Sequence, residues 1–153
     1  MDYRKRLEEL GMAWPRLERP DFPFAPAVRI GDIIYVSGQI PEIGSDIAAI
    51  GQVGKEIDLA SAQSAAALCG ANIVYWLHKE LGGDLDRIVR IAKLTVYVNA
   101  VPGFDAFSQV GNGASEFFLR MFGERGEHAR AALGMGGLPA NVPVEVDAVV
   151  HVR

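Results

Sequence analysis

Cysteine is nearly absent from this chain of 153 residues: Cys69 stands alone, which excludes an internal disulfide. Positive charge is also scarce, because 15 Lys and Arg face 19 Asp and Glu, a formal net charge of −4. No run of basic residues interleaved with aromatic residues occurs, so nucleic acid is a disfavoured partner. No apolar run approaches the roughly 20 residues that span a bilayer, and residues 1–6 lead into an amphipathic stretch instead of an apolar signal core. We therefore expect a cytoplasmic protein with no membrane partner.

Metal-ligating patterns are missing as well. His78, His128 and His151 show no metal-ligand spacing and lie on separate expected elements. The Gly-rich residues 134–137 lack the Lys-Ser/Thr and the following helix of a phosphate-binding loop, so they indicate a turn. A metal site is therefore not expected.

The composition that remains is typical of one globular domain. Hydrophobic residues make up 50% and charged residues 22%, which suffices for a core of ordinary size. The first segment, Tyr3 to Leu10, has the spacing of a short helix that ends at Gly11. The prolines at 15, 20, 23 and 26 then require an extended passage.

The next part of the chain combines a hairpin with a long helix. Residues 28–30 and 33–37 flank Gly31-Asp32, which is typical of a β-hairpin with a tight turn, and residues 40–55 are expected to form a loop. Asp58 can cap a long helix that Gly82-Gly83 ends.

A strand, a second helix and two further strands complete the order ββαβαββ. Residues 88–98 are β-branched and apolar, as in a central strand, and a helix is expected from about Phe104 to Phe122. Gly111 and Gly113 inside that helix point to close helix packing or to a backbone approach at the ligand side. We predict an α+β fold, with a mixed sheet covered on one face by two helices. The uncovered face predicts self-association.

The last 24 residues carry the candidate site. Residues 142–152 alternate almost perfectly, with valine and alanine on one face, so Glu145 points to the other face together with Asp147. Arg130 lies on the strand before it. A guanidinium and a carboxylate on neighbouring strands could hold a small carboxylate ligand and a water. Without further information, a structural ion pair near a subunit interface explains the same two residues.

A family resemblance enters through several of these segments. Residues 36–41, the helix with Asn112, and residues 144–148 resemble the Rid/YjgF family of reactive-intermediate deaminases, also labelled endoribonuclease L-PSP. The 15-residue interval from Arg130 to Glu145, with Leu-Pro between them, matches the family spacing. The resemblance covers residues 24–153, which leaves residues 1–23 as an N-terminal extension made of the short helix and the proline-rich segment.

The resemblance implies a chorismate-mutase-like fold and a homotrimer with clefts between subunits. It also implies hydrolysis of amino-acid-derived enamines and imines to 2-keto acids and ammonia, without a cofactor. Carried onto this sequence, it makes Arg130 the anchor of the substrate carboxylate and Glu145 the group that orients or activates water. Ser37 and Gly38 would line the cleft, and Asn112 would be a further polar lining residue.

Two expected cleft residues differ from many deaminase members. Phe24 replaces a tyrosine, which removes a hydroxyl, and Ala132 replaces a cysteine that hydrolysis does not need. These differences keep a second hypothesis open, namely a non-catalytic, regulatory trimer that binds small carboxylates. Endoribonuclease activity is a third hypothesis, but the chain has no histidine pair placed for acid–base work and its charge balance is acidic.

Overall fold

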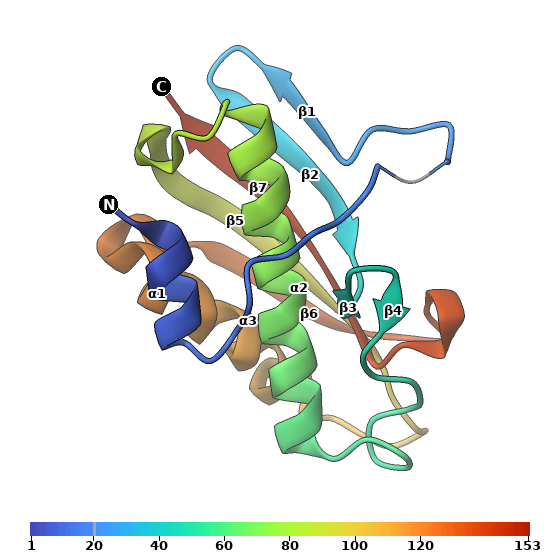
Figure 1. The fold of residues 1–153 in the computed structure, drawn as a ribbon. Helices are drawn as coiled ribbons and strands as arrows, with labels where there is room; N and C mark the ends of the chain where they lie inside the picture. The colour runs from blue at the N-terminus through green and yellow to red at the C-terminus, as the bar shows by residue number, and fades with distance from the viewer. Residues whose placement is uncertain (20) are drawn as a thin grey trace.

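The computed structural model describes residues 1–19 and 21–153, which fold into a sheet with helices on one face (Figure 1). The helices and strands are, in chain order, α1 (Tyr3–Glu9), β1 (Ala27–Ile30), β2 (Ile33–Gln39), β3 (Glu42–Ile43), β4 (Asp46–Ile47), α2 (Leu59–Glu80), η1 (Leu85–Arg87), β5 (Ile88–Asn99), α3 (Phe107–Phe122), η2 (Gly123–Gly126), β6 (Ala129–Met135), η3 (Pro139–Asn141) and β7 (Val144–Val152).

Five strands form one mixed sheet in the order β1-β2-β7-β5-β6. Strands β1 and β2, β2 and β7, and β5 and β7 pair antiparallel, whereas β5 and β6 pair parallel. Two consecutive strands that pair parallel need a long crossover connection between them, and α3 is that connection between β5 and β6. The predicted α+β class is confirmed, and so is the order ββαβαββ once α1 and the small β3–β4 hairpin are set aside.

The core lies between the sheet and helices α2 and α3. Along β7 every second side chain from Val144 to Val152 is buried, as the alternation predicted. Asp58 caps α2, since its carboxylate accepts a hydrogen bond of 2.7 Å from the backbone N–H of Ser61. The expected N-cap and the expected core face of β7 are therefore both confirmed.

Helices α2 and α3 approach so closely that a glycine is required between them. A Cβ placed on Gly113 would lie 2.7 Å from the Cα of Gln63 on α2 and would overlap the Gln63 backbone carbonyl. Backbone atoms cannot move aside as a flexible side chain can. Close helix packing, one of the two reasons expected for glycines in this helix, is confirmed at Gly113.

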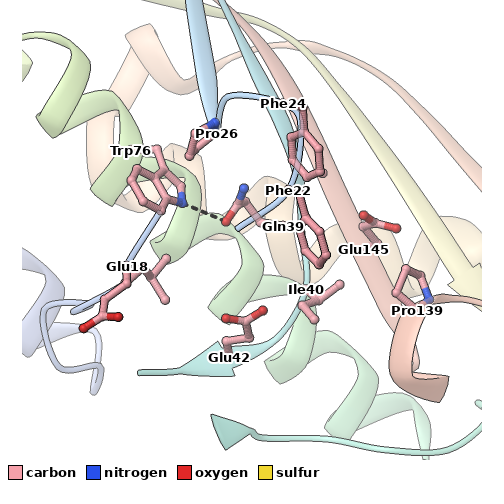
Figure 2. Close-up of a pocket in the computed structure, with 12 residues that line it drawn as sticks. Glu18, Phe22, Phe24, Pro26, Gln39, Ile40, Glu42, Trp76, Pro139 and Glu145 are labelled. Carbon is pink, nitrogen blue, oxygen red and sulfur yellow. Dashed lines mark hydrogen bonds between the residues drawn. The ribbon is translucent and has the colours of Figure 1, made fainter. Parts of the chain in front are cut away.

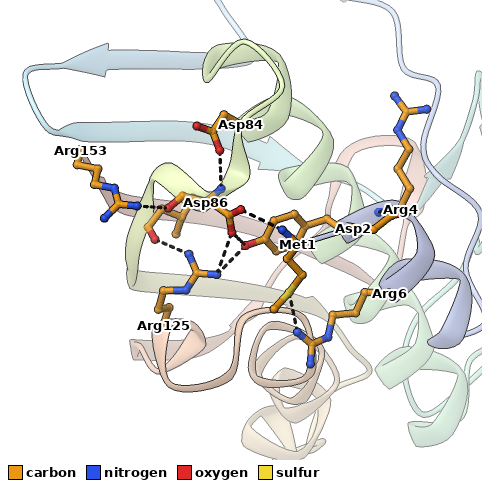
Figure 3. A network of polar contacts seen from close by, with 10 residues as sticks. Met1, Asp2, Arg4, Arg6, Asp84, Asp86, Arg125 and Arg153 are labelled. Carbon is orange, nitrogen blue, oxygen red and sulfur yellow. Dashed lines mark hydrogen bonds and ion pairs between the residues drawn. The ribbon is translucent and has the colours of Figure 1, made fainter.

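The N-terminal extension packs against the helical layer. Tyr3 and Leu7 of α1 are buried, and the Tyr3 hydroxyl donates a 2.6 Å hydrogen bond to Asp86, while Arg125 donates to the same hydroxyl (Figure 3). Further along, the Tyr75 hydroxyl on α2 donates to the backbone carbonyl of Leu17 at 2.9 Å. The short helix is confirmed at Tyr3–Glu9. Of the expected proline-rich passage, Pro20 lies outside the described residues.

Two local expectations are wrong. The stretch expected as a loop contains the β3–β4 hairpin, which turns at Gly44 with φ of +63° and is held by Asn72, whose Nδ2 donates to the carbonyls of Ile40 and Glu42 at 3.1 Å. Helix α3 begins at Phe107 instead of near residue 104, and Gly103, with φ of +85°, holds the chain out of helical conformation before it.

The sheet face opposite α2 and α3 is uncovered within the described chain, as predicted. Side chains that alternate with the core residues of β1, β2 and β6 are open to solvent, among them Val28, Tyr35 and Leu133 at 48%, 51% and 45% exposure. Apolar surface of this kind favours association. Among residues 1–19 and 21–153, no helix combines the length and apolarity that crossing a membrane requires.

We predict that Gly113→Ala destabilises the fold by about 1–3 kcal/mol, because the added methyl group meets the Gln63 backbone. Gly136→Ala is the matched control: a Cβ there meets no atom within 4 Å, so its effect should stay within about 0.5 kcal/mol. Urea denaturation of both variants provides the comparison. Equal stabilities would contradict the close α2–α3 contact.

Candidate functional site

Arg130 projects from β6 toward the helical layer and is held against α3. Its Nη1 donates to Asn112 Oδ1 at 2.9 Å and to Ser115 Oγ at 3.0 Å, and its Nη2 donates to the Ser108 carbonyl at 3.2 Å. A Cβ on Gly111 would lie 3.0 Å from Nη1, so this glycine makes room for the guanidinium. The arrangement fixes both the position and the plane of the Arg130 head group.

Two donors of this guanidinium remain for a ligand. Arginine carries five N–H donors, and three of them are used against α3. Within residues 1–19 and 21–153, Nε–H and the second Nη2–H have no hydrogen-bond partner. Two donors can bind the two oxygens of one carboxylate. Arg130 can therefore anchor a carboxylate while α3 keeps it in place.

A histidine stands behind this anchor. Ser115 Oγ lies 2.8 Å from His128 Nε2, and His128 Nδ1 lies 2.7 Å from the Gly126 carbonyl. Since a carbonyl only accepts, Nδ1 carries the proton, and in the neutral ring Nε2 accepts from Ser115. Ser115 and His128 were missed as site residues. Asn112 and Ser115 are three residues apart on one helix face, which is the signal that could have revealed Ser115.

Ala132 belongs to the same half of the site. It follows Arg130 on the same face of β6, and a Cβ on Gly111 would lie 3.4 Å from the Ala132 Cβ. Arg130 and Ala132 of β6 and Asn112 of α3 therefore meet at one place. This half of the site can bind an anion at Arg130, next to the small apolar side chain of Ala132.

Glu145 points to the opposite face of the sheet and lines a pocket of about 200 Å³ at the end of β2, whose wall also includes Trp76 of α2 (Figure 2). Gly38 on the adjacent strand β2 passes directly beneath its carboxylate, and a Cβ at Gly38 would overlap a carboxylate oxygen. Phe24 and Pro139 also line the pocket. Glu145, Gly38 and Phe24 are thus brought together as the second half of the expected cleft.

Burial changes the chemistry of this carboxylate. The pKa of Glu145 is raised above its ordinary value, first because burial disfavours the charged form and second because the Asp147 carboxylate lies nearby. Asp147 itself accepts a 2.7 Å hydrogen bond from the Tyr97 hydroxyl. A carboxylate with a raised pKa is a stronger base than an exposed one, so Glu145 is suited to take a proton from water and to return it.

Ser37 serves the fold at this edge. Its hydroxyl donates a 2.7 Å hydrogen bond to the carbonyl of Ala25. This bond ties strand β2 to the segment that carries Phe24 into the pocket. Ser37 is therefore next to the pocket, with its hydroxyl engaged by the chain itself.

The expectation that Arg130 and Glu145 project from neighbouring strands is wrong, because β5 runs between β6 and β7. Leu94 of β5 pairs with Arg130 on one side and with Ala148 on the other, so Arg130 is level with Ala148, three residues from Glu145. Two strand spacings and three residues each amount to roughly 10 Å. The side chains also point to opposite faces. One chain therefore presents two separate half-sites.

Within the part of the chain that the structure describes, no group of three or more His, Cys, Asp or Glu side chains could hold a metal ion. Cys69 is buried in the core, and burial raises the pKa of its thiol well above the ordinary value. A thiol in that state is a poor nucleophile. Proton transfer and carboxylate binding are the chemistry that the two half-sites can supply.

We predict that Glu145→Gln raises the melting temperature at pH 7. The folded pKa lies above the unfolded value, so the stability linked to this carboxyl is complete below the unfolded value and is lost as pH rises through the folded one. Glutamine is neutral at every pH, so the gain should shrink toward pH 4. Calorimetry at both pH values tests this, with Glu80→Gln at the exposed end of α2 as control. A lower melting temperature at pH 7 would contradict it.

Comparison with known proteins shows which family the chain belongs to. The family model for endoribonuclease L-PSP matches residues 17–152. Protein TCP17 of Trypanosoma cruzi is 40% identical over 148 residues, which is 96% of this chain and 92% of that protein. A 2-iminobutanoate/2-iminopropanoate deaminase of Dermatophagoides farinae is 24% identical over 91% of this chain and 93% of its own length.

Solved structures agree with these relatives. A protein of unknown function from Agrobacterium tumefaciens superposes with a TM-score of 0.91 at 43% identity, over 98% of this chain and 91% of that one. The chain is a member of the endoribonuclease L-PSP family, which is the Rid/YjgF family.

Proposed function

We propose that this protein hydrolyses small enamines and imines that carry a carboxylate, giving 2-keto acids and ammonia. The observation that carries the proposal is the pair of half-sites: an arginine with two free donors on one sheet face, and a basic carboxylate in a pocket on the other. The distant relative named as an imine deaminase supports the same reaction class.

The two halves complete each other if the uncovered sheet face of one subunit, which carries Glu145, meets the β6 edge of the next subunit, which carries Arg130. We infer a homotrimer in which Arg130 of one subunit faces the Glu145 pocket of the next. The exposed apolar side chains of that face support such an assembly. Each cleft then lies between two subunits, and Arg130 binds the substrate carboxylate while Glu145 meets the imine carbon.

The chemistry needs only positioning and proton transfer. Glu145 takes a proton from water as the oxygen attacks the imine carbon and the C=N double bond becomes a single bond. It returns this proton to nitrogen, which gives a carbinolamine. It then moves a second proton, from the new hydroxyl to nitrogen, as the C=O bond forms and the C–N bond breaks, and the products are a 2-keto acid and ammonia. An imine is already electrophilic, so orientation and one acid–base group account for the catalysis. The proposed reaction needs no cofactor.

A second candidate is a non-catalytic regulator that binds small carboxylates. The phenyl ring of Phe24 lines the pocket without a hydroxyl, and Ala132 beside Arg130 carries no thiol, so both halves have fewer polar groups than many deaminase members. Turnover separates the two candidates. Within residues 1–19 and 21–153, no histidine lines the pocket around Glu145, so a histidine pair for the acid–base steps of RNA cleavage is missing there, which disfavours endoribonuclease activity.

We predict that Glu145→Gln lowers turnover by about 10²-fold or more, because glutamine cannot accept the proton of water. Binding of a 2-keto acid should change far less, since Arg130 remains. Continuous keto-acid detection, with imines generated in situ from several amino acids, measures the turnover. Glu80→Gln is again the control. Unchanged turnover would remove Glu145 from the mechanism, and no turnover in the unmodified protein would favour the regulator.

Arg130 should behave as a forked anchor. Arg130→Ala is expected to weaken 2-oxobutanoate binding by tenfold or more, and Arg130→Lys should restore only part of it, because an ammonium cannot form two parallel hydrogen bonds. Isothermal titration calorimetry gives both affinities. If both variants bind as the unmodified protein does, the anchor lies elsewhere.

A further inference from the structure

The Glu145 pocket has an unusual lining for a site that would take only a short apolar substrate. Three acidic residues, Glu18, Glu42 and Glu145, and three aromatic residues, Phe22, Phe24 and Trp76, line one cavity, with the exposed Glu18 at its rim (Figure 2). Among residues 1–19 and 21–153, no Lys, Arg or His of the same chain contributes to its lining. We propose that the pocket binds a positively charged end of the substrate, an ammonium or a similar organic cation, opposite the carboxylate end. This inference names the substrate class of the proposed hydrolysis and rests on it.

Among residues 1–19 and 21–153, no ion pair involves Glu18, Glu42 or Glu145, and in the proposed trimer Arg130 of the next subunit is occupied by the substrate carboxylate. Burial raises the pKa of Glu42, and no basic group is among the causes of the shift at Glu42 or at Glu145. An apolar substrate tail would take water away from these carboxylates and give nothing in return, which is unfavourable. A cation supplies the missing charge, so the pocket discriminates against a neutral tail of the same shape.

The rings suit the same ligand. Phe22 and Phe24 stack with centroids 5.5 Å apart and planes at 10°, next to the Glu145 carboxylate (Figure 2). Trp76 is held in place on α2 because its Nε1 donates to Gln39 Oε1 at 3.0 Å. A cation within about 6 Å of such ring faces is attracted to them, and the attraction increases as water is excluded.

The N-terminal extension forms part of this wall. Glu18 and Phe22 precede the main domain, and the adjacent Leu17 is buried, with its carbonyl bound by the Tyr75 hydroxyl. Asn72 on α2 holds the carbonyls of Ile40 and Glu42 from beneath. The extension and α2 thus fix one side of the pocket, which gives Glu18 and Phe22 a role in specificity.

The test uses two ligands that differ only in charge. 5-Aminopentanoate and hexanoate have the same length and the same carboxylate, but the first ends in an ammonium and the second in a methyl group. Calorimetry on the full chain should give at least about tenfold tighter binding of 5-aminopentanoate, and added salt should reduce the ratio. Equal binding, or tighter binding of hexanoate, overturns the proposal.

Removing single carboxylate charges shows where the preference for the ammonium arises. Glu18→Gln and Glu42→Gln keep the shape of the pocket, and each should lower the preference about threefold or more, whereas Glu80→Gln should leave it unchanged. Thermal melts establish that each variant is folded. If neither pocket variant changes the ratio, the cation binds elsewhere and the assignment is wrong.

Pentylammonium separates this inference from the proposed function, because it has no carboxylate for Arg130. Binding of pentylammonium that is weakened about threefold or more in Glu42→Gln and kept in Arg130→Ala supports the cation pocket even if no imine is turned over. Conversely, imine turnover with no binding of pentylammonium and no preference for 5-aminopentanoate leaves the hydrolase in place and refutes the cation pocket.

Discussion

The pairing of β5 with β6 on one side and with β7 on the other is the constraint on which the rest of this structure depends. Parallel pairing with β6 forces the chain through α3, and α3 is the element that holds the Arg130 guanidinium. Antiparallel pairing with β7 sets the register that buries Val144 and turns Glu145 to the other face. The position of β5 between β6 and β7 therefore determines where each half-site lies and separates the two half-sites within one chain.

Both half-sites rely on a missing Cβ, and the Glu145 half also carries an electrostatic cost. Gly111 leaves room for Arg130, and Gly38 leaves room for Glu145, so in each case backbone approaches a charged head group closely. The Glu145 carboxylate is then half-buried beside Asp147, which favours its protonated form. A position that lowers stability when charged is typical of a site shaped for binding or proton transfer. The uncovered sheet face, with its exposed apolar side chains, likewise indicates a surface shaped for binding, in this case of another subunit.

Local patterns in the sequence were sufficient for most of the fold. The alternation in β7, the Asp58 cap and the helical spacing of α2 depend on neighbours along the chain, and they predicted these elements correctly. The site was harder to predict. Arg130 and Glu145 are 15 residues apart and were assumed to be on adjacent strands, whereas their separation depends on where β5 inserts, a long-range pairing that no local pattern contains. The role of His128 behind Arg130 and the carboxylates facing the Glu145 pocket likewise arise from tertiary contacts.

The central claim is that Arg130 of one subunit serves Glu145 of another, and mixing two inactive variants tests it most directly. Arg130→Ala and Glu145→Gln subunits, dissociated and reassembled together in equal amounts, should recover about a quarter of the unmodified turnover. That fraction follows because random cyclic association pairs an intact arginine with an intact glutamate in one cleft of four. The double variant mixed with itself should recover none. If the mixture stays as inactive as its components while assembling normally, the site lies within one subunit and the account is contradicted.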